Sequence, residues 1–406
     1  MSKYIKPLIV AIAFCLLIVS AKAKQFKAIP ASSLNAGYSF KDGLCKIKIN
    51  DKYGFINKEG NTIVECQFDY ASDFQNGFAI VRIADKYSFI LKNGLKLTQQ
   101  DYEYLEPFEG NRALFKKGGK FGYLDFNGQE VIANVFQLGM SFEGDYAVVK
   151  KGSLSGFIDR DGAEKIRPQY SFALNFTEGL APVMQNGKWG YIDYSGNEIL
   201  SFQYEIASNF KEGRATVIKN NQTVIINTKG EEMGQSTFQN ISEYVDGFAL
   251  CIIDDKFGIV NKEGALKVSG LNNAFQSSNG MYAFNRNDLW GFITAEGKEV
   301  VNPIYSAVGD FKEGMAKVQM DGKFGYINES GNLIVPIIYD SANDYSDDMA
   351  SVKMSNTYYF LDKTGLEKLS LIFNDDSESE RIIVKVNQKE SLYGDGKPVT
   401  ATIEKE

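Results

Sequence analysis

The chain has 406 residues, of which 44% are apolar and 23% charged, and a formal net charge of −7. An acidic chain without a basic stripe is a poor match for nucleic acids, so we expect no nucleic-acid partner. The sequence contains no histidine, which excludes histidine-based acid–base catalysis, Ser-His-Asp and Cys-His nucleophile pairs, and most zinc sites.

The first 23 residues have the features of a secretory signal peptide. Lys3 and Lys6 precede the apolar run 7–20, and an Ala-Lys-Ala sequence ends at Ala23. This pattern predicts cleavage near Ala23 and export to the periplasm, the outer surface or the medium. The run is shorter than the roughly 20 residues that span a bilayer, so we expect no transmembrane segment. Cys15 leaves a lipid-anchored form open as the alternative to a soluble exported protein.

After a lead-in at residues 24–39, the chain repeats itself through residues 40–373. Glycine marks ten positions with a step of 34 residues, except for one step of 33: Gly60, Gly94, Gly128, Gly162, Gly196, Gly230, Gly264, Gly297, Gly331 and Gly365. A fixed period of this size predicts an architecture in which one small unit is stacked many times. We therefore expect ten repeats in one continuous array.

A second periodic slot runs in phase with the first. It holds Gly43, Gly77, Asn111, Asp145, Gly179, Gly213, Gly247, Gly280, Gly314 and Asp348. Glycine, asparagine and aspartate tolerate a positive backbone φ angle, so we expect a left-handed turn at this slot. A small apolar residue and then a larger one follow at alternate positions, which is the period of a half-buried strand.

Each repeat is predicted to contain three strands. In the ninth repeat these are Met315–Met320, Phe324–Asn328 and Leu333–Tyr339, joined by tight turns. An asparagine or aspartate three residues before the periodic glycine, such as Asn328 before Gly331, is expected to cap the second turn. With eight prolines and no helical period, the chain is predicted to be all-β.

The middle strand of most repeats reads aromatic-Gly-aromatic-aliphatic. This pattern resembles the WG-repeat family, also called KWG repeats, over most of the chain. We take as the structural signature Trp189, Gly190, Trp290, Gly291, Phe324, Gly325 and Gly331. A glycine on this strand is expected to let a neighbouring element approach closely. Ser88, Val224 and Tyr359 replace that glycine in repeats two, six and ten, so the packing of these three repeats is left open.

The remaining reactive or aromatic residues fall on slots that already have a packing explanation. Cys45, Cys66 and Cys251 occupy positions that are apolar in other repeats, so we expect free thiols in the core rather than a disulfide. Trp189 and Trp290 are expected in the core rather than as sugar-stacking platforms. No motif predicts a metal or a cofactor, and the repeated carboxylates lie at turns, so we predict no enzymatic activity.

Residues 374–406 depart from the repeat. We expect an acidic linker and then a hairpin, with strands at residues 381–387 and 398–403, which caps the open end of the array.

Ten short repeats exceed the roughly four to eight blades that are common in closed propellers. The sequence therefore favours an open superhelical stack of blade-like sheets, with a closed β-propeller as the alternative. The extended repeat surface and the export signal predict a binding or scaffold protein of the cell envelope, and the resemblance implies interactions with other proteins. The alternative function is carbohydrate binding or carbohydrate chemistry outside the cytoplasm, so the expected partner is a protein or a glycan.

Overall fold

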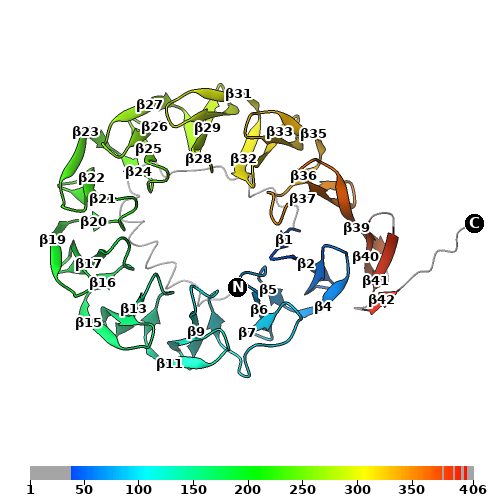
Figure 1. The fold of residues 1–406 in the computed structure, drawn as a ribbon, viewed down its shortest axis with the longest axis horizontal. Helices are drawn as coiled ribbons and strands as arrows, with labels where there is room; N and C mark the ends of the chain where they lie inside the picture. The colour runs from blue at the N-terminus through cyan, green and yellow to red at the C-terminus, as the bar shows by residue number, and fades with distance from the viewer. Residues whose placement is uncertain (1–37, 377–378, 387–388, 395–396, 400–406) are drawn as a thin grey trace, which may run out of the picture. The chain divides into compact units, whose positions relative to one another are not determined.

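The computed structural model describes residues 38–376, 379–386, 389–394 and 397–399, and its regular elements in these ranges are all β-strands (Figure 1). The all-β prediction is confirmed. The predicted signal peptide at residues 1–23, Cys15 and nearly all of the lead-in lie outside the described residues. In the described ranges, no helix is long and apolar enough to cross a membrane.

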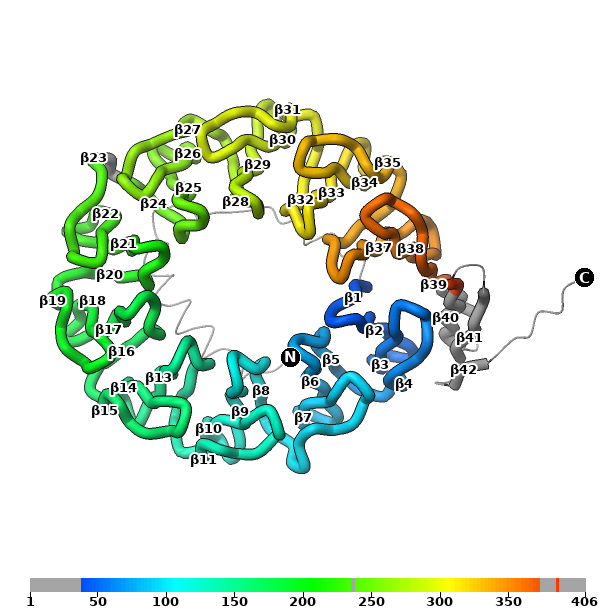
Figure 2. Tube along the Cα trace, viewed as in Figure 1, coloured from blue at the N-terminus to red at the C-terminus, as the bar shows by residue number. Residues whose placement is uncertain are grey.

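The described strands form ten antiparallel sheets, eight of them with four strands that pair in sequence order. In the ninth repeat the sheet consists of β32 (Ala307–Lys312), β33 (Met315–Met320), β34 (Lys323–Asn328) and β35 (Leu333–Tyr339), which Figure 2 traces from yellow to orange. The three predicted strands are therefore confirmed, with matching bounds for β33 and β35. The fourth strand, β32, was not predicted, because the segment that links two repeats pairs with the first long strand of the next repeat.

The chain divides into two compact bodies. The central body contains residues 151–158 and 164–303. Its strands are β14 (Leu154–Asp159), β15 (Glu164–Tyr170), β16 (Phe172–Ala173), β17 (Ala181–Gln185), β18 (Lys188–Ile192), β19 (Glu198–Tyr204), β20 (Ile206–Ala207), β21 (Arg214–Lys219), β22 (Gln222–Asn227), β23 (Glu232–Phe238), β24 (Asn240–Ile241), β25 (Phe248–Ile253), β26 (Lys256–Asn261), β27 (Leu266–Leu271), β28 (Asn273–Gln276), β29 (Met281–Arg286), β30 (Leu289–Thr294) and β31 (Glu299–Tyr305).

The terminal body contains the first repeats and the last ones. Besides β32 to β35 its strands are β1 (Phe40–Lys41), β2 (Leu44–Ile49), β3 (Lys52–Asn57), β4 (Thr62–Phe68), β5 (Tyr70–Ala71), β6 (Phe78–Ile83), β7 (Lys86–Leu91), β8 (Tyr104–Leu105), β9 (Ala113–Lys117), β10 (Lys120–Leu124), β11 (Glu130–Phe136), β12 (Leu138–Gly139), β13 (Tyr146–Lys151), β36 (Ser341–Ala342), β37 (Met349–Met354), β38 (Thr357–Asp362), β39 (Glu367–Asp376), β40 (Ser379–Val386), β41 (Lys389–Gly394) and β42 (Lys397–Val399).

Within the terminal body, the first and last sheets pack together. The ring of Phe40 on β1 lies edge-on to Phe360 on β38, with centroids 5.1 Å apart, and both side chains are fully buried in one cluster. The side-chain amide of Asn343 donates a hydrogen bond to the Tyr38 carbonyl at 2.8 Å. An open stack lacks a contact between its two ends, whereas a propeller requires one. The fold is therefore a β-propeller, the alternative that the sequence left open.

A bulge lies opposite the glycine of the middle strand in regular repeats. Phe324 of β34 pairs with Tyr339, but Tyr326 pairs with Val335, so β35 carries extra residues between these two pairs. A Cβ atom on Gly325 would lie 2.5 Å from the Val335 carbonyl oxygen. The expected close approach to this glycine is confirmed, and the approaching element is the third long strand of the same repeat.

The three repeats that lack this glycine all depart from the regular sheet. With Ser88, repeat two forms the three-stranded sheet β5–β6–β7, and residues 96–102 add only isolated bridges. With Val224, repeat six has a wider bulge on β23. With Tyr359, repeat ten has no bulge at that slot: β38 and β39 pair in regular register from Thr357 to Phe360. The loss of the glycine therefore accompanies a changed third strand in each case.

The tail continues the last sheet rather than following it as a separate element. β39 runs to Asp376 and pairs with β40, after which β41 and β42 complete a sheet of seven strands in the described ranges. Val386 of β40 packs against the cluster that joins the first and last sheets. That this tail caps the array stays a prediction.

Candidate functional site at the first turns

The first turn of each repeat connects the short strand to the first long strand. In six repeats this turn carries an acid followed by glycine or aspartate, both with positive φ, as at Glu178 (51°) and Gly179 (88°). We call these acids the first-turn acids: Asp42, Glu178, Glu212, Asp246, Glu313 and Asp347. A positive φ is unfavourable for residues other than glycine, and such residues cluster at functional sites. The hairpin turns between the first and second long strands also have positive φ, as at Asn50 and Asp51, so the recurring acids are what distinguish the first turns.

The predicted left-handed slot is confirmed where it holds glycine and at Asp348, whose φ is 64°. The prediction is wrong at Asn111 and Asp145. In these two repeats the positive φ, 60° in both, belongs to the preceding Gly110 and Gly144. A glycine one position earlier takes the unfavourable conformation at lower cost, so the slot itself no longer needs it.

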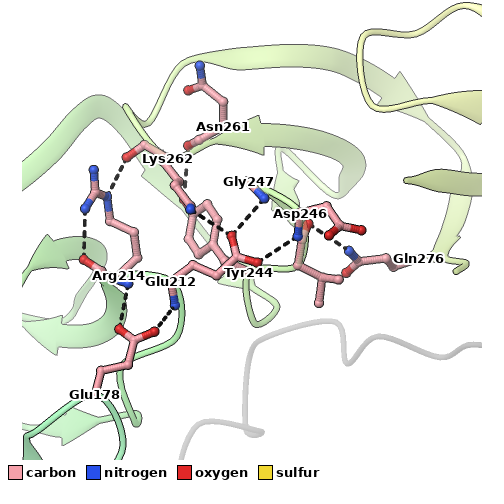
Figure 3. Close-up of polar contacts among 11 residues, drawn as sticks. Glu178, Glu212, Arg214, Tyr244, Asp246, Gly247, Asn261, Lys262 and Gln276 are labelled. Atoms are coloured by element: carbon pink, nitrogen blue, oxygen red, sulfur yellow. Dashed lines mark hydrogen bonds and ion pairs between the residues drawn. The ribbon is translucent and has the colours of Figure 1, made fainter. Parts of the chain in front are cut away.

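In the central body, two first-turn acids bind the backbone of the next first turn (Figure 3). The carboxylate of Glu178 accepts hydrogen bonds from the amides of Glu212 (2.6 Å) and Gly213 (2.7 Å). The carboxylate of Glu212 accepts hydrogen bonds from the amides of Asp246 and Gly247, both at 2.8 Å. These charge-assisted bonds connect repeat five to repeat six and repeat six to repeat seven.

The same arrangement recurs in the terminal body. Asp42 accepts a hydrogen bond from the Gly77 amide at 2.5 Å, and Glu313 accepts one from the Asp348 amide at 2.9 Å. Asp347 accepts a hydrogen bond from the amide of Gly43, which connects the last repeat to the first. Part of the acidic character of the chain thus serves contacts between repeats.

A basic residue accompanies the first-turn acids. It follows the capping asparagine or aspartate of the second turn, or the residue in that place, at Lys58, Lys92, Arg160, Lys262 and Lys363. The Nζ atom of Lys262 lies 2.9 Å from Glu212, that of Lys92 lies 2.5 Å from Asp42, and that of Lys363 lies 3.3 Å from Glu313. Sequence reasoning missed this partnership, although both members recur with the period of the repeat.

The environment of Glu212 favours its charged form. Burial raises the pKa of this carboxyl, but hydrogen bonds from Lys262 and from the amides of Gly247 and Asp246 outweigh burial, so the pKa lies below its ordinary value of 4.5. A lowered pKa means that the stabilisation is present above the pKa of the unfolded state and is lost as the pH falls through the folded one.

We therefore expect Glu212→Gln to lower the free energy of unfolding by about 1–2 kcal/mol at neutral pH. The glutamine side chain has one acceptor oxygen for the two backbone N–H groups, and it carries no charge to pair with Lys262. The difference from wild type should shrink at a pH below the lowered pKa of Glu212, because protonation then removes the same charge that the substitution removes. Urea unfolding at both pH values measures it. Glu263→Gln, at an exposed turn of the same body, is the matched control. A difference that stays constant with pH would contradict the assigned role.

The predicted signature residues are not part of the first turns. Trp189 and Trp290 are 2% and 7% exposed, on the middle strands of two repeats, and Phe324 takes the same place in a third. Gly331 has a φ of 80°, and the Asn328 carboxamide oxygen accepts a hydrogen bond from the Asn332 amide at 2.9 Å, which closes its turn. The structure distributes these residues among core and turn positions and does not bring them together in one site.

Glycines Gly190 and Gly291 face backbone in the same way as Gly325. A Cβ atom would lie 2.7 Å from the Leu200 carbonyl oxygen in the first case and 2.3 Å from that of Val301 in the second. The glycine of the signature therefore supports the sheet.

The three described cysteines are free thiols, as predicted. Cys45 and Cys251 are fully buried and Cys66 is partly buried. Burial raises the pKa of the Cys251 thiol to about 12 and that of Cys45 further, so both stay protonated near neutral pH. In the described part of the chain, no group of three or more cysteine, aspartate or glutamate residues is arranged to hold a metal ion.

Two cavities border repeats two and three of the terminal body. The first, of about 410 Å³, has an apolar floor and a polar rim: Phe74, Phe78, Ile80, Phe89, Pro107 and Phe108, with Lys41, Ser72, Asp73 and Gln75. The second, of about 390 Å³, is lined mainly by polar side chains: Leu97, Gln99, Gln100, Tyr102, Asn127, Gly128, Gln129 and Glu130. Both lie beside the repeat that has lost its glycine and its fourth strand.

Comparison with known sequences decides the family. The pattern described as WG containing repeat matches seven segments, which together cover more than half of the chain: residues 53–87, 101–121, 121–154, 156–189, 189–222, 290–324 and 324–358. The chain belongs to the WG-repeat family. The resemblance that the middle-strand motif indicated is thereby confirmed. No curated protein sequence matches this WG-repeat chain.

Solved structures similar to the WG-repeat chain have low sequence identity to it. A eukaryotic initiation factor is 11% identical, with 82% of this chain and 96% of that one covered and a TM-score of 0.46. PorZ of Porphyromonas gingivalis, a surface component of the type-IX secretion system, is 7% identical, with 89% and 66% covered and a TM-score of 0.28. Hsv2p of Kluyveromyces lactis is 10% identical, with 78% and 97% covered and a TM-score of 0.29.

Proposed function

We propose that this WG-repeat protein is an exported, non-enzymatic binding or scaffold protein of the cell envelope, which contacts a protein partner through its first turns. One observation supports this function above the others. The residue before each first-turn acid, or in the equivalent place, stands on a repeated backbone frame but differs in chemistry from repeat to repeat: Lys41, Gln75, Glu109, Glu143, Thr177, Lys211, Val245, Ser278, Lys312 and Ser346. A repeated frame with variable side chains suits recognition of an extended surface.

Export rests on the signal-like sequence of residues 1–23. The absence of a strongly basic region favours a protein partner over a nucleic acid.

A photo-crosslinking amino acid placed at single positions tests the proposal. Val245, 40% exposed, lies in a first turn, and Leu289, 38% exposed, lies at the hairpin on the opposite end of the long strands. In envelopes of the source cell, we expect a discrete protein adduct from Val245 and none from Leu289. Equal adducts from both positions, or none from Val245 and from a second probe at Gln75, would overturn the proposed function.

The second cavity favours one alternative, carbohydrate binding. Its side-chain amides at Gln99, Asn127 and Gln129, and the carboxylate of Glu130, are groups that hydrogen-bond to sugar hydroxyls. In the same experiment, an adduct that disappears after periodate oxidation of envelope glycans would support this alternative over a protein partner.

A further inference from the structure

We propose that the apolar cavity between repeats two and three binds a tryptophan or tyrosine side chain of the protein partner. This inference rests on the proposed function and assigns the chemistry of its anchoring contact. We call this space the Phe78 cavity; its volume is about 410 Å³.

The floor of the Phe78 cavity is built from rings that the core holds in place. Phe74, Phe89 and Phe108 are at most 3% exposed, and the ring centroids of Phe89 and Phe108 lie 4.7 Å apart. Phe78 is only partly buried and packs on Phe108 at 4.8 Å, so its ring forms the wall between the core and solvent. A rigid aromatic wall favours a flat apolar group, because stacked and edge-on ring pairs gain about 0.5–1.5 kcal/mol beyond their buried area.

A residue outside the cavity, Phe126, holds the Phe78 ring in place. Phe126 occupies the slot after the capping aspartate, where five other repeats carry lysine or arginine. In repeat four that slot holds Arg160, whose guanidinium lies over Phe142 at 5.3 Å. Phe126 instead stacks on Phe78, with centroids 5.6 Å apart and planes 9° from parallel, and remains 41% exposed. An aromatic surface therefore replaces a charged one here.

The polar atoms at the rim of the Phe78 cavity favour some apolar side chains over others. Asp73 and Gln75 supply carboxylate and amide oxygens to the polar rim, which also contains Lys41 and Ser72. The side chain of Asp73 is 47% exposed and lies 3.1 Å from the Lys46 ammonium, so its carboxylate reaches solvent. Tryptophan and tyrosine combine an apolar body with one hydrogen-bond donor at the tip, which matches an apolar floor below acceptors. These two residues also dominate the energetics of protein interfaces. A purely aliphatic side chain would leave the acceptors unused.

The test uses the full mature chain and N-acetyl-L-tryptophan amide as the probe, with N-acetyl-L-leucine amide as the aliphatic comparison. In calorimetric or NMR titrations we expect saturable binding of the tryptophan probe, at least tenfold tighter than that of the leucine probe. Phe78→Ala should weaken it at least tenfold. Phe248→Ala removes a partly buried phenylalanine from the same slot of repeat seven and should leave it unchanged.

A second variant guards against general destabilisation. Gln75 is exposed, so Gln75→Ala should keep the thermal stability of wild type. It should weaken binding of the tryptophan probe severalfold. Absence of saturable binding, equal binding of the two probes, or unchanged binding by Phe78→Ala would overturn the proposal. A wild-type chain that dimerises through this surface, shown by a monomeric Phe78→Ala, would also overturn it and identify a second copy as the occupant.

The outcomes separate this inference from the proposed function. A protein adduct at Val245 that persists in Phe78→Ala leaves the function in place and removes the cavity as its anchor. If the tryptophan probe binds but no protein adduct forms, the cavity still binds an aromatic side chain and the proposed protein-binding function is wrong.

Discussion

Replacing Phe360 with alanine should lower the free energy of unfolding by about 3–5 kcal/mol, the range for truncating a fully buried phenylalanine. Phe360 on β38 is 0% exposed and contacts Phe40 on β1, which is also 0% exposed. The lost ring therefore opens a cavity between the first and last sheets and not only inside one repeat. Urea unfolding measures the loss.

Hydrogen exchange locates it. In Phe360→Ala we expect faster amide exchange in β1 to β3 as well as in β37 and β38, because the two sheets share one buried cluster. Phe115→Ala is the matched control: Phe115 is also 0% exposed but packs in a cluster of repeats two and three. It should accelerate exchange in β8 to β10 and leave β1 unchanged. Unaltered exchange at β1 in Phe360→Ala would show that the two ends fold independently.

The contact between Phe40 and Phe360 explains why the sequence pattern favoured an open stack over a propeller. The periodic pattern describes one repeat and its nearest neighbour, and it predicted β33 and β35 with their observed bounds. Whether Phe40 meets Phe360 depends on small rotations between repeats that accumulate along the chain, and no local pattern encodes their sum. The expected open stack was therefore the part of the fold prediction that local periodicity could not decide.

The fourth strand was missed for a different reason. In most repeats it has two residues, as in β36 (Ser341–Ala342), so it cannot display the alternation by which strands are recognised. Its hydrogen bonds to the following long strand become visible only in three dimensions.

The candidate site was harder to predict than the fold. Aspartate and glutamate are ordinary residues at turns, so nothing in the sequence distinguished the first-turn acids from the other acids at turns. Their function as acceptors for the next turn, as between Glu178 and Gly213, depends on a contact about one repeat away. The Phe78 cavity depends on volume left unfilled, which no spacing of residues reveals.

The glycine of the middle strand, in contrast, could be assigned a structural purpose from sequence, and its replacement should have the second large effect. Gly325→Val is expected to destabilise the protein by about 3 kcal/mol, at the upper end of the usual range for overpacking. Its Cβ would meet the Val335 carbonyl oxygen at 2.5 Å, and a backbone atom cannot rotate away as a side chain can. The bulge on β35 must move or the β34–β35 ladder must break.

Val224 provides the control, because this residue already fills the same slot in repeat six. There β23 bulges more widely, from the pair Thr223 with Phe238 to the pair Ile225 with Met233. Val224→Ala should therefore cost only about 1 kcal/mol, as for trimming a partly buried side chain. Thermal and urea unfolding of both variants measure the contrast. If Gly325→Val unfolds at the wild-type midpoint, the bulge tolerates a side chain, and the glycine of the WG motif must be explained by something other than the close approach of the third strand.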